Sequence, residues 1–145
     1  MLEIEVFVEV RLTEDIEKVK RCVLNFIDPE EIYVETYGDM SRIVARARGA
    51  RSLDKLYYAL RRQRILDAAR THLRQGVVGD SIVFHLHKQA AYVGAVSFCT
   101  VPEKESPLGS IMFMIRTDSP KQFIDWLTPR TVDGKPVREA DPPDP

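Results

Sequence analysis

Residues 2–12 alternate strictly between two kinds of side chain, and this pattern constrains the fold more than any other feature of the sequence. One set of alternate positions is apolar and consists of Leu2, Ile4, Val6, Val8 and Val10. The other set is mostly charged and consists of Glu3, Glu5, Phe7, Glu9 and Arg11. Because successive side chains of a strand point to opposite faces, this segment is predicted to be a strand with one buried face. The rest of the chain must therefore cover one side of a sheet.

Other segments supply the neighbours of this strand and the layer that covers it. The pattern predicts a helix from an N-cap at Thr13 to a stop at Asp28-Pro29, strands near 32–36 and 42–48 joined at Gly38-Asp39, strands at 82–87, 95–101 and 110–116, and a helix capped by Ser119 that starts at Pro120 and stops at Pro129. The opening order of strand, helix and hairpin is typical of a split βαβ sandwich. We therefore predict an α+β fold, an antiparallel or mixed sheet sandwich with helices packed on one side.

The segment from Ser52 to Gly76 carries two apolar stripes that do not share a face. Leu53, Leu56, Tyr57 and Leu60 form the first stripe, and Ile65, Leu66, Ala69 and Leu73 form the second. At about 100° per residue the two stripes lie on nearly opposite sides of one helix, so a straight helix cannot bury both against one core. We predict two short helices with a break near residues 60–64, the first capped by Ser52 and the second ended by Gly76.

The 145 residues predict a single domain over residues 1–135 and an acidic, proline-rich tail over 136–145 that is expected to be disordered. No apolar run approaches the roughly 20 residues that span a bilayer, and the acidic start does not resemble a signal peptide. We therefore expect a cytoplasmic protein without membrane contact. Cys22 and Cys99 lie at apolar positions and are expected to be buried free thiols.

Charge is segregated along the chain although the net charge is only −1. Residues 1–40 carry a net −7, residues 41–76 carry +8 and residues 77–145 carry −2. Between residues 55 and 76 there are six basic side chains and one acid, Asp67. Guanidinium groups match phosphate oxygens and stay charged, so this surplus predicts a nucleic-acid-binding site that grips the phosphate backbone. Its candidate residues are Arg61, Arg62, Arg64, Arg70, Arg74, Lys88 and Gln89.

Two other interpretations of the basic segment remain open. The arginines could form a solvated helix face or pair with the acidic N-terminal third. Alternatively, the acidic and basic segments could pair across a homodimer, which would make the chain an interaction or scaffold protein. On the predicted sheet, cross-strand pairing with glutamates would neutralise Arg42, Arg46 and Arg48 without any ligand.

The remaining candidates for chemistry are weak. Phe7, Tyr33 and Tyr37 share the polar sheet face, where stacked RNA bases would meet repulsion from the neighbouring glutamates. His85 and His87 share a strand face, but nothing in the sequence brings His72 or another third metal ligand close to them. No nucleophile–base pair is evident, so we expect no enzyme activity, no metal, no cofactor and no small-molecule substrate.

Five segments carry a resemblance to a known family. These are Leu60-Arg61-Arg62-Gln63-Arg64-Ile65-Leu66-Asp67-Ala68-Ala69-Arg70, Lys88-Gln89-Ala90-Ala91-Tyr92-Val93-Gly94, Glu105-Ser106-Pro107-Leu108-Gly109, Asp125-Trp126-Leu127 and Asp133-Gly134-Lys135-Pro136. In this order they resemble the archaeal uncharacterised protein family 0201, although His87 stands where that family would have asparagine. The resemblance implies a fold similar to the L-five type large-subunit ribosomal protein and binding of structured RNA, with no catalytic residues. Residues and resemblance thus both lead us to expect a non-enzymatic RNA-binding protein.

Overall fold

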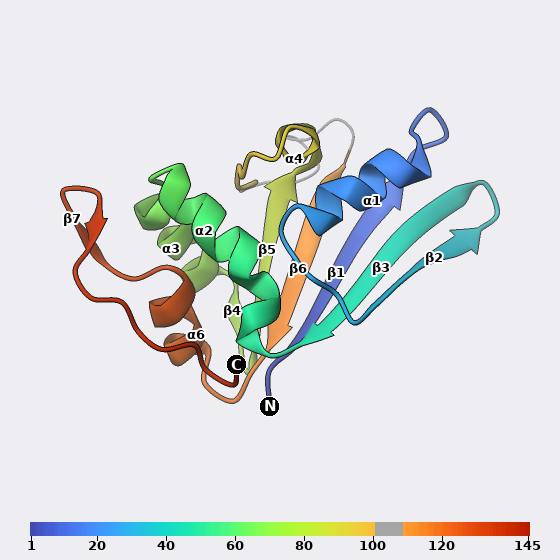
Figure 1. Cartoon of the computed structure of the whole chain (residues 1–145). Coiled ribbons are helices and arrows are strands. Elements are labelled where there is room, and N and C mark those ends of the chain that lie inside the picture. Colours follow the sequence, from blue (N-terminus) through green and yellow to red (C-terminus); the bar gives the residue numbers. More distant parts are fainter. Residues whose placement is uncertain (101–108) are drawn as a thin grey trace.

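A six-stranded antiparallel sheet forms the centre of the computed structural model, which describes residues 1–100 and 109–145 (Figure 1). The spatial order of the strands is β2-β3-β1-β6-β5-β4. Their bounds are β1 (Glu3–Val10), β2 (Glu31–Tyr37), β3 (Met40–Arg48), β4 (Val77–Val78), β5 (Ser81–His87) and β6 (Ser110–Arg116). A separate two-stranded hairpin consists of β7 (Thr131–Val132) and β8 (Lys135–Pro136).

The first strand lies in the middle of the sheet, between β3 and β6, and its alternating pattern is confirmed. The four alternating apolar side chains of β1, and that of Leu2 just before it, are at most 6% exposed. On the opposite face, Glu5 lies beside Arg46 and Glu9 lies beside Arg42 in the β1–β3 register. The Arg46–Glu5 ion pair measures 3.3 Å and Arg42 pairs with Glu35 of β2, so the predicted cross-strand pairing is confirmed for these two arginines. Arg48 has no ion pair in the described part of the chain.

Helices gather on the apolar side of the sheet, which confirms the predicted α+β class (Figure 1). Their bounds are α1 (Ile16–Leu24), the 3₁₀ helix η1 (Ala50–Leu53), α2 (Asp54–Arg62), α3 (Leu66–Gln75), α4 (Lys88–Tyr92) and α6 (Pro120–Leu127). Their buried side chains join those of the strands in one apolar core cluster. The longer helices α1, α2, α3 and α6 pack along the sheet, whereas α4 follows directly after β5 at the end of that strand.

The predicted break between two short helices is confirmed. Helix α2 ends at Arg62 and α3 begins at Leu66. Between them Arg64 adopts φ 57°, a left-handed conformation that turns the chain, and the Ile65 N–H donates to the Leu60 carbonyl at 3.2 Å. The turn lets both apolar stripes face the same core, as Leu60 and Leu73 are both fully buried.

Two predicted helix caps are corrected. Ser52 lies inside η1 rather than at an N-cap, and its hydroxyl donates to the Gly49 carbonyl at 2.8 Å. Gly49 occupies the N-cap with φ 82°, a conformation that favours glycine. Helix α1 starts two residues later than predicted, because the Asp15 side chain and not Thr13 accepts the N-terminal hydrogen bond, from the Glu17 N–H. The Ser119 cap, Pro120 in the first turn of α6 and the end of α3 at Gly76 are confirmed.

The strand predicted over 95–101 is wrong in its described part. Residues 95–100 form a single bridge, Phe98 opposite Leu86, flanked by backbone hydrogen bonds from His87 to Ser97 and from Cys99 to His85. Strand β4 already pairs with the first two residues of β5 on its outer edge. Residues 95–100 can therefore pair only with the C-terminal end of β5. Val101 and the loop with Pro102 and Pro107 lie outside the described residues.

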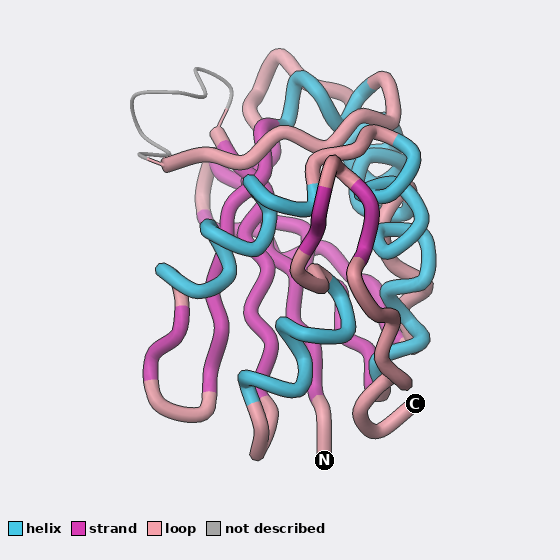
Figure 2. The backbone as a smooth tube through the Cα atoms, turned by 90° about the vertical axis from the view of Figure 1, so that its left-hand side faces the viewer, coloured by secondary structure: helices cyan, strands magenta, loops and turns pink. Residues whose placement is uncertain are grey.

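The C-terminal segment, residues 136–145, contacts several distant parts of the chain. The Val137 N–H donates to the Arg130 carbonyl at 2.9 Å, and the Glu139 carboxylate pairs with Arg61. Asp144 accepts from the Leu2 N–H through its side chain at 2.5 Å. The two ends of the chain consequently lie side by side, at the bottom of Figures 1 and 2. No helix in the described part of the chain is long and apolar enough to cross a membrane.

Candidate nucleic-acid interface

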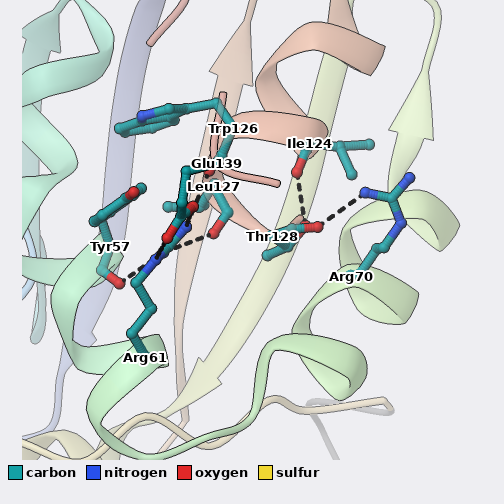
Figure 3. Close-up of polar contacts among 8 residues, drawn as sticks. All are labelled: Tyr57, Arg61, Arg70, Ile124, Trp126, Leu127, Thr128 and Glu139. Atoms are coloured by element: carbon teal, nitrogen blue, oxygen red, sulfur yellow. Dashed lines mark hydrogen bonds and ion pairs between the residues drawn. The ribbon is translucent and has the colours of Figure 1, made fainter. Parts of the chain in front are cut away.

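Arg61 was predicted to face solvent, but it is held inside the molecule by four kinds of contact. Its guanidinium binds Glu139 as a fork, with Nε and Nη2 donating to the two carboxylate oxygens at 2.9 and 2.7 Å. It also donates to the Tyr57 carbonyl and lies over the Tyr57 ring, with Cζ 3.3 Å from the ring centroid. Backbone carbonyls of α6 accept its remaining hydrogen bonds (Figure 3). Arg61 is therefore a structural residue that fastens α2 to the C-terminal segment.

The hydrogen bonds from Arg61 hold the pKa of the Glu139 carboxyl below its ordinary value. Burial opposes this shift, but the charge-assisted bonds outweigh it. Glu139 is thus ionised at neutral pH and fully matched to Arg61.

Arg70 was also predicted to bind phosphate, and it too has internal partners. Its Nη2 lies 2.9 Å from Asp125 Oδ1. Its Nη1 donates to the Thr128 carbonyl at 2.9 Å (Figure 3). Its side chain is only 13% exposed. Arg70 therefore joins α3 to the end of α6, and we do not count it among the cations that face solvent.

Lys88 was expected at the surface, but its side chain is completely buried. The Nζ donates to the Glu9 carbonyl at 2.7 Å and to Glu14 Oε1 at 3.0 Å. Burial raises the pKa of Glu14, but hydrogen bonds from the Arg11 N–H, from Lys88 and from Tyr92 outweigh it and leave that pKa lowered. Lys88 therefore neutralises a carboxylate in the core, while its neighbour Gln89 is exposed.

Arg62, Arg64 and Arg74 are exposed and have no ion pair or hydrogen-bond partner for their guanidinium groups among residues 1–100 and 109–145. Arg62 and Arg64 stand at the break between α2 and α3, and Arg74 stands in the last turn of α3. Since α3 has ten residues, the two positions are separated by about 15 Å of helix. These three, which we call the α3 arginines, are the arginines of the predicted site that face solvent.

A hollow of about 670 Å³ adjoins the C-terminal half of α3 and adds an arginine that the sequence did not predict. The residues that line this α3–β7 hollow are Asp67, Arg70, Thr71, Arg74, Gln75, Arg130 and Thr131. Arg130 belongs to a segment of the chain with a slight acidic excess, so composition alone gave no reason to single it out. The Thr131 hydroxyl binds the Asp67 carboxylate and holds the start of β7 against α3.

Of the three aromatic side chains on the polar sheet face, Phe7 and Tyr33 lie against arginines and Tyr37 is 58% exposed. Arg42 lies over the ring of Phe7, with Cζ 5.0 Å from the centroid, and Arg46 lies 5.8 Å from the ring of Tyr33. Arg42 in turn binds Glu35 at 2.6 Å. Arg42 and Arg46 on this face are therefore matched by glutamates of the same chain and lie against aromatic rings.

The histidines and cysteines do not form a reactive centre in the described part of the chain. His72 stacks on Phe98, with the ring centroids 5.0 Å apart, and His85 lies 3.1 Å from the Ser110 hydroxyl. No group of three or more potential metal ligands occurs among the described residues. Cys22 and Cys99 are buried and form no disulfide, as predicted, and burial raises the pKa of Cys22 to about 11.

The sequence of this chain matches a known protein family and full-length archaeal relatives. Residues 3–117 match a protein family whose model is described as RNA binding. The chain is also 48% identical to a UPF0201 protein from Pyrobaculum neutrophilum, over 99% of its own length and 100% of that of the relative. A UPF0201 protein from Saccharolobus islandicus is 44% identical over 99% of both chains. The chain therefore belongs to the archaeal family UPF0201, as the resemblance of its sequence segments indicated.

Solved structures agree with this assignment. A crystal structure of a UPF0201 protein from Methanococcus jannaschii has a TM-score of 0.80 at 34% identity, and the match covers 94% of this chain and 99% of that one. A DUF54 protein from Methanothermobacter thermautotrophicus has a TM-score of 0.57 at 20% identity, covering 81% of this chain and 85% of that one. The second likeness concerns the fold alone.

Proposed function

We propose that this protein binds structured RNA without catalysis, and that the α3 arginines Arg62, Arg64 and Arg74 contact the phosphate backbone. The observation that carries the proposal is that these three guanidinium groups are exposed and without an internal partner in the described chain, whereas Arg61 and Arg70 have carboxylate partners. An exposed guanidinium binds a phosphate through two parallel charge-assisted hydrogen bonds. The family's RNA-binding description supports the same class of ligand.

The internally paired cations have a different task in this proposal. Arg61 fixes α2 to the C-terminal segment, and Arg70 fixes α3 to α6. Both contacts hold the helices that carry the α3 arginines, so Arg61 and Arg70 act as positioning residues. Lys88 stabilises the core around Glu14, and of the two α4 candidates only Gln89 remains a surface contact.

Structured RNA is a better ligand than an unpaired strand for a surface of this kind. Single-stranded RNA is recognised largely by stacking its bases on open aromatic rings. Here the rings of Phe7 and Tyr33 lie under arginines and beside glutamates. A helix edge with separated cations instead suits the regular phosphate spacing of a duplex or hairpin.

The test is fluorescence anisotropy of a labelled RNA hairpin across a potassium chloride series. The variant R62A/R64G/R74A removes the three cations, with glycine at position 64 because φ is positive there. We expect its affinity at low salt to fall at least tenfold, and its salt slope to fall by about two, since each lost phosphate contact lowers the slope by roughly 0.7 to 0.9.

The matched control K18A/R21A/R51A removes the same charge from exposed residues of α1 and η1. It should change the affinity much less and leave the slope near that of the wild type. Equal losses in the two triple variants would reduce the site to an effect of total charge, and an unchanged affinity in R62A/R64G/R74A would refute the proposal.

The homodimer alternative is less well supported by the contacts. It needs unmatched acidic and basic segments, yet Arg42 and Arg46 pair with glutamates of the same chain. Arg61 likewise pairs with Glu139, and Arg70 pairs with a carboxylate of α6. Light scattering at low and high salt tests it directly. A dimer that dissociates as the salt concentration rises would favour the scaffold interpretation.

A further inference from the structure

We propose that the α3–β7 hollow binds the terminal phosphate of an RNA strand, which is a phosphate monoester, while Arg62 and Arg64 at the helix break contact internal phosphates. This inference rests on the proposed function and adds to it a preference for phosphorylated RNA ends. It concerns the hollow lined by α3 and by the start of β7, where Arg70, Arg74 and Arg130 meet.

Three guanidinium groups line the hollow with unequal freedom. Arg70 is fixed by Asp125 and by the Thr128 carbonyl, so it presents a rigid positive wall. Arg74 lies one turn further along the same face of α3. Arg130 comes from the segment after α6, and neither its side chain nor that of Arg74 has a partner in the described chain. The two adaptable guanidinium groups, Arg74 and Arg130, are the donors that can close around an anion, while Arg70 holds the wall behind them in place.

The charge of the lining matches a dianion better than a monoanion. Asp67 is the only carboxylate among the lining residues, and it already accepts the hydrogen bond of Thr131. Because Asp125 already matches the charge of Arg70, the lining offers two unmatched cations to a ligand, Arg74 and Arg130. A phosphate monoester carries about −1.5 to −2 at pH 7, because its second pKa is about 6, whereas each internal phosphodiester carries a single negative charge. The terminal phosphate is thus the group of an RNA strand that best balances this hollow.

Size and the neutral lining residues agree with an RNA end. The volume of about 670 Å³ lies within the range of sites that hold whole small ligands, so a nucleotide enters with its phosphate. Thr71 and Gln75 supply a hydroxyl and an amide on the same helix face as Arg74. The Thr71 hydroxyl donates to the Asp67 carbonyl, which leaves its oxygen able to accept from a ribose hydroxyl.

An adjoining hollow has a lining in which positive and negative charges are more nearly equal. It has a volume of about 570 Å³, shares Arg70 and Arg130, and continues toward the C-terminal segment. Its lining also includes the carboxylates of Asp125, Glu139 and Asp141, which nearly balance its cations. The excess of positive charge is therefore concentrated on the α3–β7 side.

The experiment compares one RNA hairpin with a 5′-phosphate, with a 3′-phosphate and with hydroxyl groups at both ends, by competition in the anisotropy assay. For the wild type we expect one phosphorylated form to bind at least fivefold more tightly than the hydroxyl form. The R130A variant should lose this preference but keep the affinity for the hydroxyl form within twofold. R62A/R64G should do the reverse, with weaker binding of all forms and a preserved preference.

Controls separate the failure of this inference from that of the proposed function. R116A removes an exposed arginine of β6, far from the hollow in sequence and absent from its lining, and should leave the preference intact. If the wild type binds all three RNAs equally and with a steep salt dependence, RNA binding stands and the terminal-phosphate site is refuted. If no RNA binds, the proposed function fails. In that case a rise in the melting temperature with adenosine monophosphate but not adenosine, absent in R130A, would still support a phosphate site, and its absence would refute it.

Discussion

At the scale of single residues, the basic side chains of this chain fall into two groups that look alike in sequence. Arg61 and Arg70 have carboxylate partners 78 and 55 residues further along the chain, whereas Arg62, Arg64 and Arg74 have none in the described part. The distinction depends on a single contact in each case. It decides which arginines hold the fold together and which can bind a ligand.

Lys88 and Glu14 form a buried ion pair whose loss should destabilise the fold. Replacing it by methionine leaves the Glu14 carboxylate almost buried and without its cation, since the side chains are 0% and 6% exposed. We expect Lys88→Met to lower the free energy of unfolding by about 3–5 kcal/mol. Urea denaturation measures this loss. The double variant E14Q/K88M should recover part of it and Gln89→Ala should cost almost nothing, whereas a loss below about 1 kcal/mol for Lys88→Met would contradict a buried ion pair.

The Arg61–Glu139 pair predicts a dependence on pH. Because Arg61 lowers the pKa of Glu139 in the folded chain, the pair contributes fully above the ordinary value of 4.5. The contribution is lost as the pH falls through the lowered pKa. We expect E139Q to cost about 1 kcal/mol at pH 7, a small figure because the carboxylate is partly open to solvent, and to cost less at pH 3. Asp141→Asn, which removes an exposed charge from the same segment, should show no such convergence in urea titrations at the two pH values.

At the scale of elements, the break between α2 and α3 is what brings two apolar stripes onto one core. The chain turns at Arg64, whose φ of 57° is unfavourable for any residue with a Cβ atom. The same turn holds Arg62 and Arg64 at the surface. One strained residue thus serves both the packing of the helices and the exposure of the cations.

Glycine at position 64 should therefore separate stability from RNA binding. It relieves about 1–2 kcal/mol of left-handed strain and costs about 0.4–1 kcal/mol of chain entropy. We expect Arg64→Gly to leave the free energy of unfolding unchanged or raise it by about 1 kcal/mol, while RNA affinity falls. Arg62→Gly, within α2, should instead cost about 1 kcal/mol. If chemical denaturation gives both variants the same loss, the strain at Arg64 is not relieved by glycine.

At the scale of the whole molecule, the C-terminal segment runs from α6 along the helices and ends beside the first strand (Figures 1 and 2). Glu139 binds Arg61 on the way, and Asp144 meets the backbone N–H groups of Leu2 and Ala50 at the end. The segment 138–145 carries one arginine and three acids, so it also holds negative charge near the basic helices. The segment therefore connects α2, η1 and the start of the chain, which are distant from it in sequence.

Deleting residues 138–145 should weaken the fold and strengthen RNA binding. The lost hydrogen bonds and ion pair are together worth about 2–3 kcal/mol, which lowers the melting temperature by roughly 5–10 °C. The freed Arg61 and the loss of net negative charge should raise the affinity for the RNA hairpin and steepen its salt slope. Calorimetry and anisotropy measure the two effects. A truncated chain with unchanged melting temperature would show that these contacts do not hold the segment in solution.

The individual strands, helices and helix ends could be predicted from the sequence, because each of them depends on neighbours within a few residues. Alternation fixed β1, two apolar stripes fixed the break at Arg64, and Ser119 with Pro120 fixed the start of α6. These patterns follow from the period of a strand, the period of a helix and the hydrogen bonds at a helix end. The charge pairing across β1 and β3 was equally accessible, since a register of neighbouring strands is enough to derive it.

Three features could not be predicted from the sequence and emerge only from the folded chain. They are the pairing of the charges, the pairing of segment 95–100 and the position of Arg130. Lys88 finds Glu14 over a separation of 74 residues, and Arg61 finds Glu139 over 78, distances at which composition carries no information about contact. Segment 95–100 has a strand-like pattern but meets only the free end of β5. Electrostatic interactions act through space and not along the chain, so the division of the arginines into internally paired and solvent-facing groups exists only once the helices have packed.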